Sequence, residues 1–302
     1  VYGDLITTTN AIPGITVLMP NKDIRGEDYD TYFSFRMSNK PTVLATAAST
    51  QVTSTGTHVG TAQLGEDPLP WLYQYPGILQ PTPNLAVSAE GKGVVTSSPE
   101  LDGVTRRIPL VVNSQEKLYP SFALELLRVA IGDPSYQLKA GTQGIEWIRI
   151  PNYPLMNTDA NGRIFLDWNT KFYKQTGVEF INNPIEAPFV IVGTTAEGVT
   201  NPVPTPAGPK YPHEIQANIL HNLIQGTAPS SPSWALAVEY AVALLAFLTL
   251  AFASRSIWLS VPALALFTVG SSYGAWYAYQ SSYLIDASGI VILSILFWAY
   301  HS

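Results

Sequence analysis

The sequence predicts a mixed-sheet α/β sandwich followed by a C-terminal anchor of membrane-spanning helices. Two patterns carry this prediction. In the first part of the chain, short β-branched runs alternate with amphipathic stretches, as they do where helices pack on a sheet. In the last part, charge almost disappears: 13% of the 302 residues are charged, and beyond Trp234 the charged ones are Glu239, Arg255 and Asp286. We therefore expect one domain over residues 1–232 and a second over 233–302.

The anchor is expected to contain three helices. Its apolar runs cover about residues 234–253, 257–279 and 283–300. Each run has roughly the 17 to 25 residues that cross a bilayer as a helix. The loop between the first two runs carries Arg255 and the next loop is uncharged, so the positive-inside rule places Arg255 in the cytoplasm and residues 1–232 outside it.

Two features of the anchor bear on partners. Glu239 and Asp286 lie near the outer ends of the first and third runs, where snorkelling or contact with a partner helix is the ordinary interpretation and an ion pathway the sharper alternative. Small residues around Gly270 and Gly274 would let another helix approach the second run closely. We expect contact with lipid, and association with other membrane proteins or with a second copy.

The first domain is expected to open with a strand ending near Thr7, followed by a short helix from Glu27. The buried side of that helix would be formed by Tyr29, Tyr32, Phe33, Phe35 and Met37. Further strands are predicted over residues 41–46, 93–97, 104–112, 147–150 and 164–168. Pro109 should place its strand at an edge or a bulge. A helix is predicted from Leu118 until Gly132.

Residues 65–84 contain five prolines, which exclude regular structure over most of the segment. Trp71, Tyr73 and Tyr75 would hold it against the body of the domain. We interpret it as an ordered loop or a loop that binds a partner.

The stretch 188–226 combines three elements. Phe189–Val192 is a short apolar run typical of a buried strand. A turn with two glycines and two threonines follows, and then a Pro-rich loop. From Pro212 the apolar residues recur with helical spacing until Gly226, which predicts an amphipathic helix.

Three motifs resemble those of the CHASE2 family of extracytoplasmic sensory domains. They are Gly103–Leu110 with Tyr119–Leu126, then Asn161–Asp167, and finally Val190–Gly198 with Thr205-Pro206 and Tyr211–Gly226. The resemblance implies a signal-input domain in the bacterial inner membrane, upstream of a cytoplasmic nucleotide cyclase, histidine kinase or serine/threonine kinase. It also implies an upstream membrane span and a first β/α segment, because residues 1–6 look like an internal strand of such a domain.

The turn after the predicted strand is the candidate ligand site. Gly193, Thr194, Thr195 and Gly198 could present backbone N–H groups to a small anion or ligand, with Arg106 as a nearby cation. A purely structural turn is the competing interpretation, and a surface position is the ordinary one for Arg106. A nucleotide phosphate loop is rejected because Val199 stands where its lysine should be.

Several other chemistries are not supported. Asp159–Gly162 begins like a calcium loop but lacks the closing glutamate, so a hairpin turn is favoured. The four histidines are scattered, the chain has no cysteine, and a net charge of −6 argues against nucleic acid as a partner. No catalytic motif is recognisable. We therefore expect no cofactor, no metal and no enzymatic activity.

Two hypotheses remain. The first is a membrane-anchored sensory domain with an unidentified small ligand. The second is an accessory or structural subunit that has kept the same body and anchor and docks on a larger membrane complex, using the segment 65–84 and the Gly270 face as contact surfaces. A solute-binding protein or envelope enzyme would need a deep polar pocket, which the sequence does not indicate.

Overall fold

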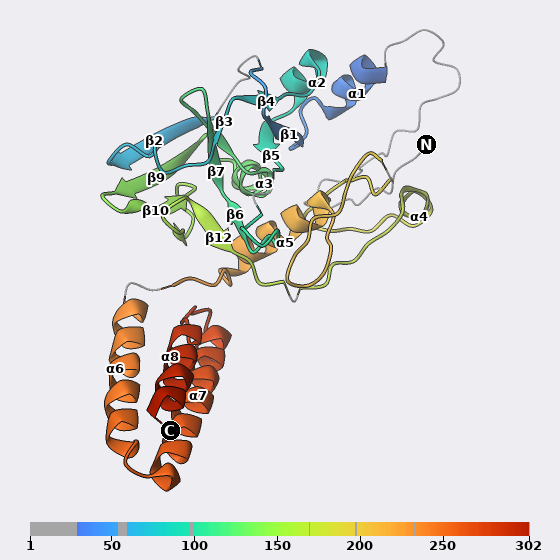
Figure 1. Ribbon diagram of the computed structural model, residues 1–302. Helices are drawn as coiled ribbons and strands as arrows, with labels where there is room; N and C mark the ends of the chain where they lie inside the picture. Colours follow the sequence, from blue (N-terminus) through green and yellow to red (C-terminus); the bar gives the residue numbers. More distant parts are fainter. Residues whose placement is uncertain are drawn as a thin grey trace. The chain divides into compact units, whose positions relative to one another are not determined.

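The computed structural model describes residues 29–53, 59–96, 99–168, 170–196, 198–231 and 234–301. The chain divides into two compact units, Val1–Gly226 and Thr227–Ser302 (Figure 1). The strand expected before Thr7 lies outside the described residues.

The first unit is a mixed α/β fold, as predicted. Its helices are α1 (Tyr29–Met37), α2 (Pro83–Ser88), α3 (Phe122–Ile131), α4 (Gly177–Asn182) and α5 (Pro212–Gln225). Its strands are β1 (Val43–Ser49), β2 (Gly60–Gly65), β3 (Gln74–Tyr75), β4 (Gly77–Leu79), β5 (Gly91–Val94), β6 (Arg107–Pro109), β7 (Val111–Ser114), β8 (Lys117–Pro120), β9 (Ser135–Gly141), β10 (Gly144–Arg149), β11 (Met156–Asn157) and β12 (Arg163–Phe165).

The described strands form small sheets, and most of these mix parallel and antiparallel pairs. In the order β4-β1-β5, β1 runs antiparallel to β4 and parallel to β5. In the order β11-β10-β9-β2, β9 runs antiparallel to β10 and parallel to β2. In the order β3-β7-β8, β7 runs parallel to β3 and antiparallel to β8. β6 pairs antiparallel with β12 alone, so Pro109 does lie on an edge strand, as expected.

Helix α3 is largely buried, with seven of its ten residues in the interior. Ser121 caps its N-terminus by accepting a hydrogen bond from the backbone N–H of Leu124, and Gly132 ends it in the left-handed conformation, at φ 80°. The helix was expected to begin at Leu118. Residues 117–120 instead form β8, because they pair with β7 around a two-residue turn at Gln115-Glu116.

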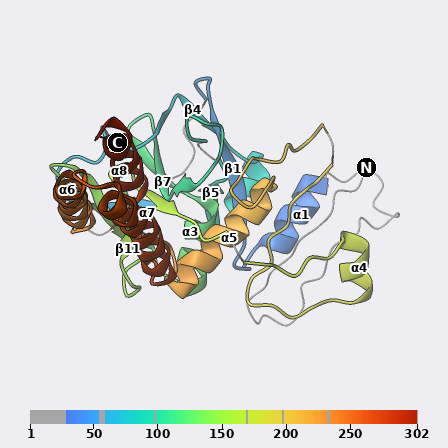
Figure 2. The same cartoon turned by 60° about the horizontal axis from the view of Figure 1, so that its bottom comes forward.

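Helix α5 packs beside α3, as Figure 2 shows. The predicted helix over Pro212–Gly226 is confirmed, with Pro212 in its first turn and Gly226 as its left-handed C-cap. The side-chain Oε1 of Gln216, which is 1% exposed, accepts a 3.0 Å hydrogen bond from the backbone N–H of Ala123 at the start of α3. A buried polar side chain therefore links α5 to the start of α3 at a defined position.

Two expectations for the first unit are wrong. Residues 189–192 form no strand, because no neighbouring described strand pairs with them and Ile191 is their one buried side chain. Helix α1 exists, but its aromatic side is not buried: Tyr29, Phe33 and Phe35 are 58%, 46% and 74% exposed, and Met37 is the buried residue. α1 instead lies beside α2 (Figure 1), and its Asp30 accepts a hydrogen bond from Thr82, the residue before α2.

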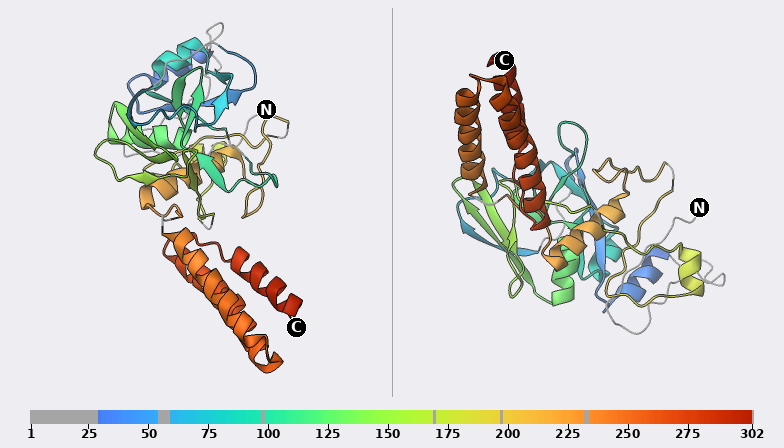
Figure 3. Two further views of the ribbon diagram at one scale, coloured as in Figure 1. Left: turned by 60° about the vertical axis from the view of Figure 1, so that its left-hand side comes forward. Right: turned by 90° about the horizontal axis from the view of Figure 1, so that it is seen from below.

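The second unit contains three helices, α6 (Ala235–Ala253), α7 (Ile257–Gln280) and α8 (Ser288–His301), which run alongside one another in Figure 3. α6 and α7 are long and apolar enough to cross a membrane, whereas α8 has 14 residues. The phenyl rings of Phe247 and Phe297 join α6 to α8 edge to face, and the indole N–H of Trp298 donates a 3.1 Å hydrogen bond to Ser260 of α7.

The third predicted span, residues 283–300, is not confirmed at that length. Leu284 donates a backbone hydrogen bond to the carbonyl of Ser230, and Tyr283 pairs with Ser230 in a β-bridge. Asp286 then accepts hydrogen bonds from the backbone N–H and hydroxyl of Ser288, which sets the start of α8. The first five residues of the predicted span are thus held in a non-helical connection.

Candidate functional site

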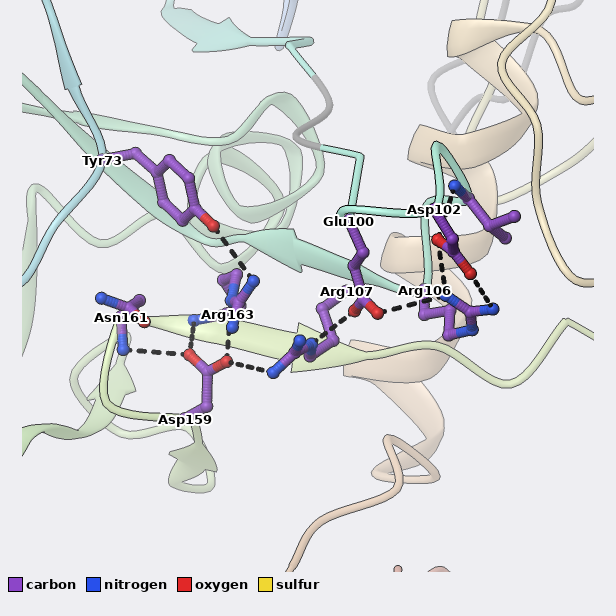
Figure 4. Close-up of polar contacts among 9 residues, drawn as sticks. Tyr73, Glu100, Asp102, Arg106, Arg107, Asp159, Asn161 and Arg163 are labelled. Carbon is purple, nitrogen blue, oxygen red and sulfur yellow. Dashed lines mark hydrogen bonds and ion pairs between the residues drawn. The ribbon is translucent and has the colours of Figure 1, made fainter.

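Six charged side chains converge where β6 and β12 pair. The charged cluster contains three carboxylates and three guanidinium groups, from Glu100, Asp102, Asp159, Arg106, Arg107 and Arg163 (Figure 4). The antiparallel register places Arg107 opposite Phe165 and Arg163 opposite Pro109, so the two arginines come from facing strands. The formal charges balance, and each guanidinium has a carboxylate partner.

Asp159 is the centre of the charged cluster. Its Oδ1 accepts 3.0 Å hydrogen bonds from the backbone N–H groups of Asn161 and Arg163, and its Oδ2 lies 2.7 Å from Nε of Arg163 and 3.3 Å from a terminal nitrogen of Arg107. Gly162 completes the turn at φ 71°, a value that favours glycine. The tight turn predicted at Asp159–Gly162 is confirmed, but the flanking strands β11 and β12 belong to different sheets and form no hairpin among the described residues. Asp159 holds the turn and two arginines.

The charged cluster and its turn also form hydrogen bonds to the Pro-rich segment, residues 65–84. The guanidinium of Arg163 donates a 3.0 Å hydrogen bond to the hydroxyl of Tyr73 and lies 5.7 Å from the centre of its ring. The side-chain amide of Asn161 donates a 2.8 Å hydrogen bond to the carbonyl of Trp71. Tyr73 and Tyr75 also pack against the core residues Ile78, Val94, Val112 and Tyr119. The expectation that aromatic residues hold this segment to the body is therefore confirmed, while its contact with a partner stays a prediction.

Arg106 forms a two-point ion pair at the exposed end of the charged cluster. Its terminal nitrogens lie 3.1 and 2.7 Å from the two oxygens of Asp102, and 3.2 Å from Glu100. These hydrogen bonds lower the pKa of Asp102 from 3.8 to about 2. Because the folded-state pKa lies below the unfolded value, the stabilisation is present above about pH 4 and is lost as the pH falls towards 2.

Replacing Arg106 by glutamine should return the pKa of Asp102 towards 3.8, because the guanidinium hydrogen bonds are the first cause of its depression. The measurement is a titration of the Asp102 side-chain carboxyl ¹³C shift. Lys117→Gln, which removes a cation outside the charged cluster, is the control and should leave the titration at about 2. An unchanged Asp102 titration in the Arg106 variant would contradict the assigned pairing.

The predicted turn at residues 193–198 is not joined to Arg106 by any hydrogen bond or ion pair among the described residues. Gly193 lies directly against the imidazole of His213, so that an added Cβ would overlap the ring. His213 is itself buried and stacked on Tyr211, with ring centres 5.8 Å apart. The hydroxyl of Thr194 accepts a 3.2 Å hydrogen bond from the backbone N–H of Ala196, and Gly198 is in the left-handed conformation, at φ 79°. The close glycine–histidine packing supplies a structural reason for Gly193.

Glu125 and Arg128 of α3 form a second charged group, whose burial the sequence did not predict. The carboxylate of Glu125, which is 0% exposed, accepts hydrogen bonds from Nε and a terminal nitrogen of Arg128 at 2.9 and 2.8 Å, and another from the hydroxyl of Tyr136. The backbone N–H of Lys92 in β5 lies 3.3 Å away. Gly91 leaves the necessary space, since an added Cβ would lie 2.5 Å from the carboxylate.

The buried environment shifts three pKa values. The hydrogen bonds that Arg128 donates to the carboxylate of Glu125 raise the pKa of Arg128. Burial and the neighbouring negative charge of Glu125 raise the pKa of Tyr136, so it remains a proton donor. Burial lowers the pKa of Lys92, against the attraction of Glu125. The hydrogen bonds of this buried group link α3 to β5 and β9.

Metal ligands do not gather in the described residues: no group of three or more His, Asp or Glu side chains there could hold an ion.

In the second unit, Gly270 and Gly274 lie on an exposed side of α7, where an added Cβ would meet nothing within 4 Å. Glu239 in α6 accepts a 2.8 Å hydrogen bond from the backbone N–H of Asp286, so these two acids meet within this chain.

A model of the family described as the CHASE2 domain matches residues 11–254. The match covers most of the first unit, including the charged cluster and α5, and extends through α6. No curated protein matches the chain, and no solved structure does.

Proposed function

The chain belongs to the CHASE2 family of extracytoplasmic sensory domains, and from that membership we propose that it is the non-catalytic input domain of a bacterial signalling protein, anchored in the inner membrane. The observation that carries the proposal is the family match, which extends from residue 11 to residue 254 and so includes the first apolar helix, α6. The sensory body and its first membrane helix therefore belong to one family unit.

The lengths of the C-terminal helices support an anchor. At 1.5 Å per residue, α6 and α7 are about 29 and 36 Å long, close to or above the ~30 Å of a bilayer's hydrocarbon core. α8 is about 21 Å long. We propose that it crosses as a third span together with the extended residues 283–287, with a locally thinned bilayer accommodating the mismatch. Arg255 then lies in the cytoplasm and the first unit outside.

Cysteine accessibility tests this topology cleanly, because the chain has no cysteine of its own. Single cysteines are placed in the α6–α7 connection (Ser254→Cys), the α7–α8 connection (Ser281→Cys) and near the C-terminus (His301→Cys). A membrane-impermeant maleimide should label the Ser281 variant in intact spheroplasts and the other two after permeabilisation. Labelling of the His301 variant from outside would reduce the anchor to two spans, and labelling of the Ser254 variant from outside would invert the orientation.

In the proposed role, an external stimulus favours one arrangement of the extracytoplasmic domain, and the membrane helices transmit that preference inward. The charged cluster suits this purpose because it joins β6, β12 and the Pro-rich segment, which come from distant parts of the sequence, into one hydrogen-bonded unit. A change at one of these segments would therefore reach the others through specific contacts.

A second candidate function is an accessory subunit that docks on a larger membrane complex. The exposed small-residue side of α7 at Gly270 and Gly274 favours it, since close helix packing uses such surfaces. The exposed aromatic side chains of α1 add a further unoccupied apolar surface. The two candidates differ in whether the chain carries an output domain or is held by other proteins.

A further inference from the structure

A cleft of about 230 Å³ lies beside the first half of α5. One wall comes from the segment that follows β12 and the other from the start of the helix. Its lining residues are Trp168, Thr170, Lys171, Phe172, Lys174, Lys210, Glu214 and Asn218. Glu214 and Asn218 are one helical turn apart, so both face the same side of α5. The cleft does not include the turn predicted from sequence at residues 193–198.

Positive charge predominates in the cleft. Glu214 is ion-paired with Lys174 and accepts a 2.7 Å hydrogen bond from the backbone N–H of Tyr211. Burial alone would raise the pKa of Glu214, but the hydrogen bonds of Lys174 and Tyr211 and the charges of Lys174 and Lys210 outweigh it, and the pKa lies below its ordinary value. Glu214 is thus an anion that neutralises Lys174.

Lys171 and Lys210 form no direct ion pair among the described residues, although the charge of Lys210 also acts on Glu214. With Lys174 balanced by Glu214, the cleft keeps an excess of two positive charges, in a chain whose net charge is −6. Asn218 is 4% exposed, and its side-chain amide nitrogen donates to no described residue, while its oxygen accepts from Asn222 at 3.3 Å. A nearly buried donor and two lysines without a direct ion pair therefore line the same cleft.

The remaining walls are aromatic. Phe172 is held by an edge-to-face contact with the imidazole of His221, with ring centres 6.1 Å apart, and Trp168 lines the same cleft. Aromatic walls with a few polar groups are typical of sites for small molecules, although this cleft is smaller than the roughly 300–1,000 Å³ of drug-sized sites. The volume of the cleft and its aromatic lining suit a compact ligand with a flat apolar part.

We propose that this cleft binds a small aromatic carboxylate. The carboxylate would be held by the ammonium groups of Lys171 and Lys210 and by the amide N–H of Asn218, and the ring would lie between Trp168 and Phe172. The role of this ligand as the signal rests on the sensory function proposed above. Binding itself depends only on the cleft, so a failure of binding and a failure of the proposed topology are separate results.

The test is calorimetric titration of the full chain in nanodiscs with sodium benzoate, beside the neutral benzyl alcohol and inorganic phosphate. Benzoate should bind, and benzyl alcohol should bind at least tenfold more weakly because it lacks the charge. Phosphate should also bind at least tenfold more weakly because it cannot use the aromatic walls. Equal binding of benzyl alcohol, tighter binding of phosphate, or no binding of benzoate would overturn the proposal.

Variants locate the binding. The double substitution Lys171→Gln with Lys210→Gln should weaken benzoate binding at least tenfold, whereas Lys40→Gln with Lys117→Gln, which removes the same charge elsewhere in the first unit, should leave it unchanged. Asn218→Asp places a carboxylate in the cleft and should weaken binding by a similar factor. Circular dichroism confirms that each variant is folded. Full affinity in both cleft variants, or an equal loss in the Lys40/Lys117 control, would overturn the proposal.

Discussion

Replacing Arg128 by methionine should lower the free energy of unfolding of the extracytoplasmic unit by about 3–5 kcal/mol, the usual cost of leaving a buried charge without its partner. Glu125 has a fully buried side chain, and Arg128 supplies two of its hydrogen bonds and its counter-charge. Methionine would fill much of the space of the arginine side chain but would supply neither the hydrogen bonds nor the positive charge. For a unit of this size, the loss corresponds to a fall in Tm of roughly 6–20 °C, measured on the full chain by near-ultraviolet circular dichroism.

Two further variants separate charge from packing. Glu125→Gln combined with Arg128→Met removes both charges and should unfold at a higher temperature than Arg128→Met alone. Arg149→Met removes a half-buried arginine that hydrogen-bonds Gln137 rather than a carboxylate, and should cost less than about 1.5 kcal/mol. If the double variant were less stable than Arg128→Met, the buried-charge explanation would be wrong.

Replacing Gly93 by alanine should destabilise the same unit by about 1–3 kcal/mol, because it forces a methyl group between a strand and a helix. An added Cβ at Gly93 would overlap the Cα of Phe122 and lie 2.8 Å from its nitrogen and 2.9 Å from the carbonyl oxygen of Ser121. Those are backbone atoms of the α3 N-terminus and cannot rotate away. The change should appear as a lower midpoint of thermal unfolding.

Gly60 in β2 is the matched control, since an added Cβ there would meet nothing within 4 Å. Gly60→Ala should be neutral or slightly stabilising, because it reduces the conformational freedom of the unfolded chain. Equal midpoints for the two alanine variants would mean that β5 and α3 are not in the close contact described.

Elements whose ends are marked locally were predictable. Helix α5 has a proline and an acidic residue in its first turn and a glycine after its last, and its buried residues recur with helical spacing. Helix α4 has a comparable local marker: Thr176 and Glu179 form a capping box, which the sequence shows as the pattern T-x-x-E. Strand β9 also showed its alternation of buried Tyr136, Leu138 and Ala140.

Other features depend on contacts between distant residues. Glu125 and Arg128 look like an ordinary surface pair on a helix, and their burial follows from Tyr136 and the space left at Gly91. The turn at Gln115-Glu116 lacks the asparagine or glycine that signals a two-residue hairpin, so the sequence does not mark residues 117–120 as a strand.

The candidate sites also combine features that adjacent residues predict with features that depend on distant contacts. The tight turn at Asp159 was predictable because its residues are adjacent, but the ion pair of Asp159 with Arg107 spans 52 residues. The cleft at α5 brings together residues from 168–174 and 210–218, and their lysines show no spacing that would identify a site. The non-helical connection before α8 is likewise held by a bridge between Tyr283 and Ser230, which an apolar run cannot indicate.

The central claim, that this chain is the input domain of a signalling protein, is tested most directly by the intact mass of the polypeptide purified from native membranes in mild detergent, together with the proteins that co-purify in fixed ratio. The sensory account predicts a single chain longer than 302 residues, with a cytoplasmic output domain after Ser302. A polypeptide ending near Ser302 and held stoichiometrically by other membrane proteins would contradict it and identify a docking subunit.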